Sequence, residues 1–128
     1  GPEISSYGVI SGTKQTDRVH LLDKIVEKPV LEEAPSDMGV TGRYIFTPQL
    51  FAHLAALKPG AGGEFQLTDA IQTLLTEEQV LAYEYEGIRY DCGSKLGLLK
   101  ANIELGLQHS EIGDDLRDYL KNELASKL

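Results

Sequence analysis

The fold is decided by the stretch Val19-His20-Leu21-Leu22-Asp23-Lys24-Ile25-Val26-Glu27-Lys28-Pro29. Its apolar side chains, three of them β-branched, predict a strand over residues 19–27. Proline has no N–H to donate to a neighbouring strand, so Pro29 ends the strand and favours an extended backbone at Lys28. Successive residues of a strand face opposite sides, so Glu27 and Lys28 can serve one ligand only if the strand end twists.

Three further segments show strand patterns on either side of this stretch. Residues 6–10 alternate weakly before a glycine and predict a short strand and a turn. Residues 40–46 are rich in β-branched and aromatic side chains and predict another strand. Residues 80–86 alternate again and predict a half-exposed strand, which Gly87 turns into a hairpin partner at 88–91.

Helical patterns fill the region between the strands. Thr47 and Pro48 provide a hydroxyl N-cap and a proline at the first helical position. The apolar face of this helix consists of Leu50, Leu54 and Leu57. After the glycine-rich loop at 60–64, Thr68 or Asp69 caps a second helix. Its apolar residues are Ile71, Leu74 and Leu75.

Two more helices are expected towards the end of the chain. Ser94 caps a helix that runs to about Gln108. This helix has apolar residues on two faces, so it is either buried on both sides or faces a partner. Asp114 begins the last helix. The order of strands and helices indicates an α/β or α+β fold.

Length and composition exclude several classes of protein. The 128 residues suit one domain, a quarter of them are charged, and no apolar run is long enough to span a membrane. The formal net charge of −8 disfavours nucleic acid as a partner, because an acidic surface repels phosphate backbones. A single cysteine excludes an internal disulfide framework, and the three histidines share no metal-ligand spacing. We therefore expect a cytoplasmic protein.

Three polar segments lie where strands or helices end. Glu27 and Lys28 can bind sugar hydroxyls and a phosphate, although spacing alone favours a solvated strand end. Asp91 lies between a predicted strand and a helix, where its carboxylate either binds Mg²⁺ or caps the turn. The loop at 60–64 lacks the Gly-Lys-Ser/Thr ending of a phosphate-binding loop, which favours a tight connection between two helices.

Taken in order, these segments resemble the C-terminal half of bacterial UTP–glucose-1-phosphate uridylyltransferases, a branch of the sugar nucleotidyltransferases. The resemblance extends over residues 6–124. It rests on Tyr7-Gly8-Val9-Ile10, Ile25-Val26-Glu27-Lys28-Pro29, Val40-Thr41-Gly42-Arg43-Tyr44-Ile45, Lys58-Pro59-Gly60-Ala61-Gly62-Gly63-Glu64-Phe65-Gln66-Leu67-Thr68-Asp69-Ala70 and Arg89-Tyr90-Asp91-Cys92-Gly93. It implies an α/β fold, the C-terminal part of a nucleotide-diphospho-sugar transferase, with a Rossmann-like mixed sheet and C-terminal helices.

The resemblance also implies an activity. Such an enzyme makes UDP-glucose and pyrophosphate from UTP and glucose 1-phosphate, with Mg²⁺ as cofactor. The substrate-binding residues it implies are Gly8, Glu27, Lys28, Val40 and Tyr44. Lys28, which would contact the phosphates, is implied as the catalytic residue, and Asp91 as the metal ligand. No role follows for Glu64, Gln66, Thr68 and Asp69.

The nucleotide-binding half of that family, with its G-x-G-T-R loop, matches nothing in this sequence. We therefore expect residues 3–128 to be the C-terminal part of a nucleotidyltransferase domain, preceded by a cloning scar at 1–2 and inactive by itself. UTP binds through the missing half in this interpretation, and residues 94–128 form a helical tail through which the protein is a homo-oligomer. Two alternatives stay open: a non-catalytic protein-interaction module, and a fragment of a glucose-1-phosphate thymidylyltransferase.

Overall fold

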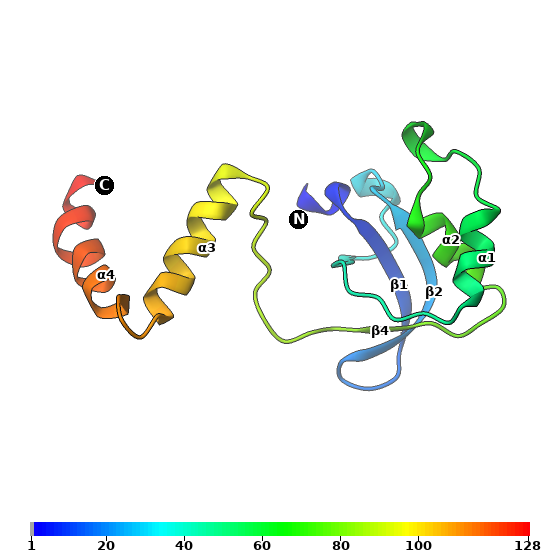
Figure 1. Ribbon diagram of the computed structural model, residues 1–128, viewed down its shortest axis with the longest axis horizontal. Helices are drawn as coiled ribbons and strands as arrows, with labels where there is room; N and C mark the ends of the chain where they lie inside the picture. The colour runs from blue at the N-terminus through cyan, green and yellow to red at the C-terminus, as the bar shows by residue number, and fades with distance from the viewer. Residues whose placement is uncertain (1) are drawn as a thin grey trace. The chain divides into compact units, whose positions relative to one another are not determined.

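A four-stranded sheet organises the first part of the chain (Figure 1), and the computed structural model describes residues 2–128. The strand order is β3-β1-β2-β4, with β1 at Gly8–Lys14, β2 at Val19–Glu27, β3 at Met38–Gly39 and β4 at Leu81–Tyr83. β2 confirms the predicted strand at 19–27. Every pairing among the described strands is antiparallel: β1 pairs with β2 and with β3, and β2 pairs with β4. The described residues therefore form an antiparallel sheet where a mixed sheet is predicted.

The hairpin of β1 and β2 contains a bulge at Asp23. Ser11 pairs with Lys24 and Gly12 pairs with Leu22, so Asp23 has no residue opposite it. The hydroxyl of Ser11 donates to the Asp23 carboxylate at 2.5 Å across the bulge. A side chain at Gly12 would collide with the carbonyl oxygen of Leu21, so the bulge requires glycine there.

The strand predicted at 40–46 is wrong. β3 ends at Gly39, and the N–H of Val40 adds one last bond to the carbonyl of Gly8 at 2.8 Å. β1 begins at Gly8, so an antiparallel neighbour that continues past Val40 finds no further residues of β1 to pair with. Residues 41–46 therefore keep a strand pattern without belonging to the described sheet.

The other strand predictions are partly right. β1 covers Gly8–Lys14 where residues 6–10 are predicted. β4 keeps the middle of the predicted strand at 80–86, because its partner β2 begins at Val19, opposite Tyr83. Within the described residues no strand forms at 88–91, so the predicted hairpin is wrong.

Two helices close the core of this first unit, which spans Gly1–Tyr85. α2 (Leu67–Leu74) packs on β2, and α1 (Gln49–Ala55) packs on α2 (Figure 1). Both helices are predicted from their apolar spacing. The buried core consists of Ile10, Ile25, Leu50, Ala70, Ile71 and Leu74.

The caps predicted for these helices are wrong. The hydroxyl of Thr47 donates to the Glu78 carboxylate at 2.8 Å, and α1 begins without a side-chain cap. α2 already begins at Leu67, so Thr68 and Asp69 lie within its first turn. The Thr47 hydroxyl thus binds a tertiary neighbour in place of the helix backbone, and Thr68 is buried in the first turn of α2.

Gln72 covers an edge of the sheet that no strand occupies. β4 pairs only with the first three residues of β2, so the outer N–H of Ile25 meets no partner strand. The Oε1 atom of Gln72, on α2, accepts that N–H at 2.9 Å. This bond ties α2 to β2 and satisfies a backbone group that burial would otherwise leave unpaired.

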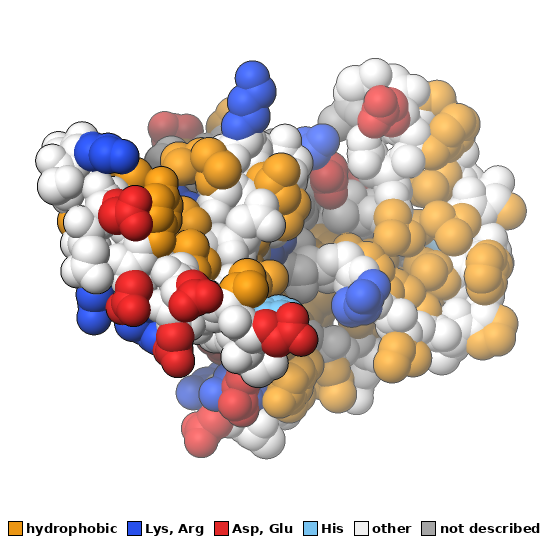
Figure 2. Space-filling model, turned by 60° about the vertical axis from the view of Figure 1, so that its left-hand side comes forward, with side chains coloured by type: hydrophobic (Ala, Val, Ile, Leu, Met, Phe, Trp, Pro, Cys, Tyr) orange, Lys and Arg blue, Asp and Glu red, His pale blue; other side chains and the backbone are white. Residues whose placement is uncertain are grey.

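The second unit, Glu86–Leu128, is helical. α3 spans Lys95–Gln108 and has the predicted cap, because the Ser94 hydroxyl accepts the Gly97 N–H at 3.0 Å. α4 spans Gly113–Tyr119 and continues as further helical turns over Leu120–Leu124 and Ala125–Lys127. Apolar and acidic side chains both reach the surface of this unit (Figure 2), and the apolar ones include Leu96, Leu99 and Leu105 of α3. Within residues 2–128, no helix is both long enough and apolar enough to cross a membrane.

The bond between Gln72 and Ile25 gives a stability prediction. Replacing Gln72 by methionine keeps the length of the side chain but removes the acceptor, which leaves the Ile25 N–H unpaired. We expect the free energy of unfolding to fall by about 1–3 kcal/mol, measured by urea denaturation. Gln72→Glu is the matched control, since it keeps an oxygen at the same place. Equal stability of the methionine variant and the wild type would contradict the structural role of this bond.

Candidate functional site

The candidate site lies where β1 begins and β2 ends. Gly8 and Glu27 are paired across the hairpin. A Cβ atom placed on Gly8 would lie 3.3 Å from Oε2 of Glu27, 3.2 Å from Cγ2 of Thr68 and 3.9 Å from Cβ of Val40. Four segments of the chain therefore meet at the Cα atom of Gly8, which is accessible to them only because glycine has no side chain.

The carboxylate of Glu27 is half-buried and unsatisfied. Among the described residues, no hydrogen bond or ion pair reaches it. An ionised carboxylate accepts hydrogen bonds at both oxygens and donates none. Glu27 therefore presents an open acceptor next to Gly8, suited to a ligand that offers hydroxyl or N–H donors.

The charge of this carboxylate affects the pKa of Tyr44. Burial raises the pKa of the Tyr44 phenol above its usual 10.0, and the negative charge of Glu27 raises that pKa further. The ring of Tyr44 stacks on Phe46 with the ring centres 5.5 Å apart. Val40 is tied to Gly8 through its backbone N–H. Of the residues predicted to bind substrate, Gly8, Glu27 and Val40 lie together, and Tyr44 lies within electrostatic reach of Glu27.

Lys28 has an unusual backbone. Its φ angle is 42°, so the extended conformation predicted from Pro29 is wrong. The Lys28 N–H donates to the carbonyl of Tyr7 at 2.9 Å, and the following residue, Pro29, is buried. This hydrogen bond and the burial of Pro29 hold the chain in the turn. Positive φ costs a residue with a side chain about 1–3 kcal/mol, and such strain is concentrated at functional sites. The lysine side chain itself is exposed.

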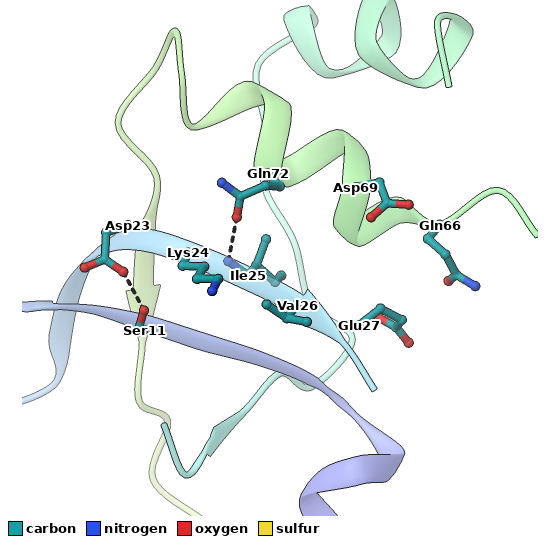
Figure 3. A pocket seen from close by; sticks show the side chains of 9 residues that line it. All are labelled: Ser11, Asp23, Lys24, Ile25, Val26, Glu27, Gln66, Asp69 and Gln72. Atoms are coloured by element: carbon teal, nitrogen blue, oxygen red, sulfur yellow. Dashed lines mark hydrogen bonds between the residues drawn. The ribbon is translucent and has the colours of Figure 1, made fainter. Parts of the chain in front are cut away.

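An open cleft of about 650 Å³ borders Glu27 on the side of α2. Figure 3 shows Glu27 at the end of β2, with Gln66 and Asp69 across the cleft at the start of α2. Its remaining walls are Ser11, Asp23, Lys24, Ile25, Val26 and Gln72. Val40 and Tyr44 line a second, larger groove of about 1100 Å³. The predicted substrate-binding residues thus border two hollows.

Asp91 belongs to the second unit. Its side-chain Oδ1 accepts the N–H of Gly93 at 3.1 Å, and its carbonyl accepts the hydroxyl of Ser94 at 3.1 Å. The carboxylate is exposed and thus keeps access to a cation while it shapes the turn. Among the described residues no group of three or more potential ligands could hold a metal. A single exposed carboxylate fits Mg²⁺, which takes one or two carboxylates and completes its shell with water and substrate phosphates.

Thr68 is the residue of this site to which the sequence gives no role. Only 6% of it is exposed, and its methyl group touches the space above Gly8. The available signal is its spacing, because Thr68 lies three residues before Ile71 and shares the buried face of α2.

Comparison with known proteins defines the class. The profile of the family described as nucleotidyl transferase matches residues 2–107, so this chain belongs to the nucleotidyl transferase family. Its relatives include the UTP–glucose-1-phosphate uridylyltransferase of Streptococcus pneumoniae serotype 4, 46% identical over 119 residues. A second relative, UTP–glucose-1-phosphate uridylyltransferase 1 of Streptococcus pyogenes serotype M1, is 45% identical over 119 residues. Each alignment covers 92% of this chain but only 40% and 39% of the relatives.

Solved structures agree with this assignment. A crystal structure of UDP-glucose pyrophosphorylase complexed with UDP-glucose superposes with a TM-score of 0.79 at 42% identity, covering 84% of this chain and 41% of that one. UTP-bound UGPase from Acinetobacter baumannii superposes with a TM-score of 0.78 at 33% identity, covering 95% and 42%. The predicted resemblance to bacterial UTP–glucose-1-phosphate uridylyltransferases is confirmed, and the chain spans about two fifths of the length of these relatives.

The shifted pKa of Tyr44 makes its distance from Glu27 testable. Glu27→Gln removes the charge, so we expect the pKa of Tyr44 to fall. It should stay above 10.0, because burial is the larger cause and remains. A pH titration of tyrosine-labelled protein by NMR measures this, and Tyr44→Phe assigns the signal. Asp23→Asn is the control, since Asp23 is not a cause of the shift. An unchanged Tyr44 pKa in Glu27→Gln would show that the charge of Glu27 does not act on Tyr44.

Proposed function

We propose that this chain carries the sugar-phosphate half of the active site of an enzyme that makes UDP-glucose and pyrophosphate from UTP and glucose 1-phosphate. The observation that carries the proposal is the Glu27 carboxylate, which has no hydrogen-bond partner among the described residues. Glu27 lies opposite Gly8 in the β1–β2 register, so this carboxylate borders the space above Gly8. The relatives that bear this enzyme's name support the choice of reaction. Because the chain spans two fifths of their length, the whole reaction is proposed for a longer protein that includes these residues.

In this proposal Glu27 accepts hydrogen bonds from hydroxyls of glucose. Adjacent sugar hydroxyls can donate to the two oxygens of one carboxylate, which fixes both the position and the orientation of the ring. Gly8 offers its backbone and leaves room for the sugar, since any side chain there would press on Glu27 and Thr68. Val40 and Tyr44 provide the wall of the sugar pocket, with the backbone of Val40 held by Gly8.

Lys28 is the proposed catalytic residue. The reaction transfers a uridylyl group to the phosphate of glucose 1-phosphate, so negative charge increases around the reacting phosphorus. A lysine ammonium neutralises such charge, and removing a comparable group lowers the rate by about 10²-fold or more. The strained backbone at Lys28 supports this role, because an asparagine or glycine would adopt the same turn at lower free energy.

Asp91 is the proposed ligand of Mg²⁺. The ion, when bound, would neutralise phosphate charge, and one carboxylate oxygen of Asp91 would be its contact with this chain. UTP is proposed to bind through residues outside this chain, since no G-x-G-T-R loop occurs in the sequence. We therefore expect residues 3–128 to bind the sugar phosphate without transferring a nucleotide, as a cytoplasmic protein. Which base the enzyme uses depends on that other half, so thymidylyl transfer is the second candidate reaction.

Calorimetric titration of the 128-residue chain tests the proposed half-site. We expect glucose 1-phosphate to bind weakly, with UTP giving no heat of binding, because Glu27 and Lys28 lie on this chain and the nucleotide loop does not. The Glu27→Gln variant should lose the binding, since a neutral amide replaces the charged acceptor. If the folded chain does not bind glucose 1-phosphate, either with or without Mg²⁺, the result would contradict the proposal and favour a non-catalytic interaction module.

Comparing two ligands in the same titration separates the roles of the neighbouring residues. Lys28→Asn keeps a residue that tolerates positive φ but removes the ammonium. We expect it to weaken the binding of glucose 1-phosphate while leaving any binding of glucose itself unchanged. Lys14→Asn, at the other end of β1 from Gly8 and outside the lining of both hollows, is the matched control. Equal affinity of Lys28→Asn and the wild type for glucose 1-phosphate would remove Lys28 from the phosphate site.

We also propose that residues 94–128 form an oligomerisation region. Leu99 is 60% exposed on α3, in a helix that is apolar on two faces. Leu99→Ser should therefore reduce self-association, measured by sedimentation velocity at a fixed protein concentration. Lys100→Ser changes the neighbouring exposed position and is the control. The same distribution of species in wild type and Leu99→Ser would exclude this helix face as the interface.

A further inference from the structure

Thr68 is a buried polar residue with an unpaired side chain. It is 6% exposed, and its Oγ1 atom has no hydrogen-bond partner among the described residues. Buried hydroxyls in native proteins are almost always paired, because an unpaired one destabilises the fold. Valine has the same shape and would fill this position without that penalty. The hydroxyl therefore serves something other than the stability of the free protein.

The end of the Thr68 side chain and the carboxylate of Glu27 both border the space above Gly8. Cγ2 of Thr68 and Oε2 of Glu27 lie 3.2 Å and 3.3 Å from the same point, the place of a Cβ atom on Gly8. In threonine the methyl group and the hydroxyl are bonded to the same carbon, Cβ, so rotation about the Cα–Cβ bond changes which of them occupies a given place. Rotation by a third of a turn moves the hydroxyl to the place of the methyl group, above Gly8 and next to Glu27.

The two unsatisfied groups complement one kind of ligand. The Glu27 carboxylate accepts hydrogen bonds, whereas a threonine hydroxyl both donates and accepts. A sugar hydroxyl that donates its proton to Glu27 keeps lone pairs that can accept from Thr68. We infer that Thr68 is a specificity-determining residue, whose hydroxyl turns towards Gly8 and pairs with a hydroxyl of the sugar held by Glu27. This inference rests on the proposed function, because it requires a sugar at Gly8 and Glu27.

A purely structural role makes the opposite demands on the side chain. If Thr68 only fills space against Gly8, its methyl group matters and its hydroxyl does not. Thr68→Val keeps the methyl group and shape but removes the hydroxyl. Thr68→Ser keeps the hydroxyl but removes the methyl group. If the hydroxyl binds the sugar, Thr68→Val is therefore the more damaging variant. If Thr68 only fills space, Thr68→Ser is the more damaging one.

The test compares wild type, Thr68→Val and Thr68→Ser by thermal unfolding without ligand and by calorimetry with glucose 1-phosphate. We expect Thr68→Val to melt at a higher temperature, because it loses an unpaired buried hydroxyl, and yet to bind about 10-fold more weakly. Thr68→Ser should melt at a lower temperature and bind within about 3-fold of wild type. This opposition between stability and affinity does not arise from a packing role.

Deoxy analogues of glucose 1-phosphate identify the hydroxyl concerned. One analogue should lose affinity for wild type and Thr68→Ser but not for Thr68→Val, since that variant has already lost the bond. Unchanged affinity of Thr68→Val for glucose 1-phosphate would overturn the inference and leave the proposed function intact, as would a lower melting temperature of that variant. Absence of binding to the wild type would overturn the proposed function and the inference together.

Discussion

The pairing of β1 with β2 determines where each group of the candidate site lies, and the bulge at Asp23 sets that pairing. Leu22 and Ile25 are three residues apart, so a regular strand would point them to opposite faces, yet both pack on the core. The extra residue at Asp23 shifts the alternation and brings both inward. Glu27 is two residues after Ile25 and thus shares its face, the face that α2 covers. Without the bulge, the carboxylate would face away from Thr68.

Three unfavourable features meet at this end of the hairpin. The Glu27 carboxylate is half-buried without a partner, the Thr68 hydroxyl is buried without one, and Lys28 has a positive φ angle. Earlier in β2, by contrast, the backbone N–H of Ile25 is paired with Gln72. Local violations that gather at one place are typical of a site shaped for a ligand, because the ligand supplies the missing partners.

The sequence predicts the elements whose pattern and packing agree. β2, the two core helices and the Ser94 cap follow from apolar spacing and local capping chemistry. Residues 41–46 are different, because a segment with strand propensity needs a neighbouring strand to pair with. β1 begins only at Gly8, so it offers these residues no partner. For the site, spacing alone favours a solvated end at Glu27, and only the family resemblance indicates a ligand. Thr68 escapes both arguments, since the burial of its hydroxyl results from tertiary packing against Gly8.

The backbone at Lys28 resolves a geometric conflict between two neighbouring side chains. In a regular strand Glu27 and Lys28 would point to opposite faces, so they could not approach one ligand. A φ angle of 42° ends the strand between them and changes the direction in which the lysine leaves the backbone. The carbonyl of Tyr7 and the buried ring of Pro29 hold this turn in place. The strain therefore lies at the one peptide unit where a residue suited to hydroxyls adjoins a residue suited to a phosphate. A sugar phosphate presents those two groups side by side.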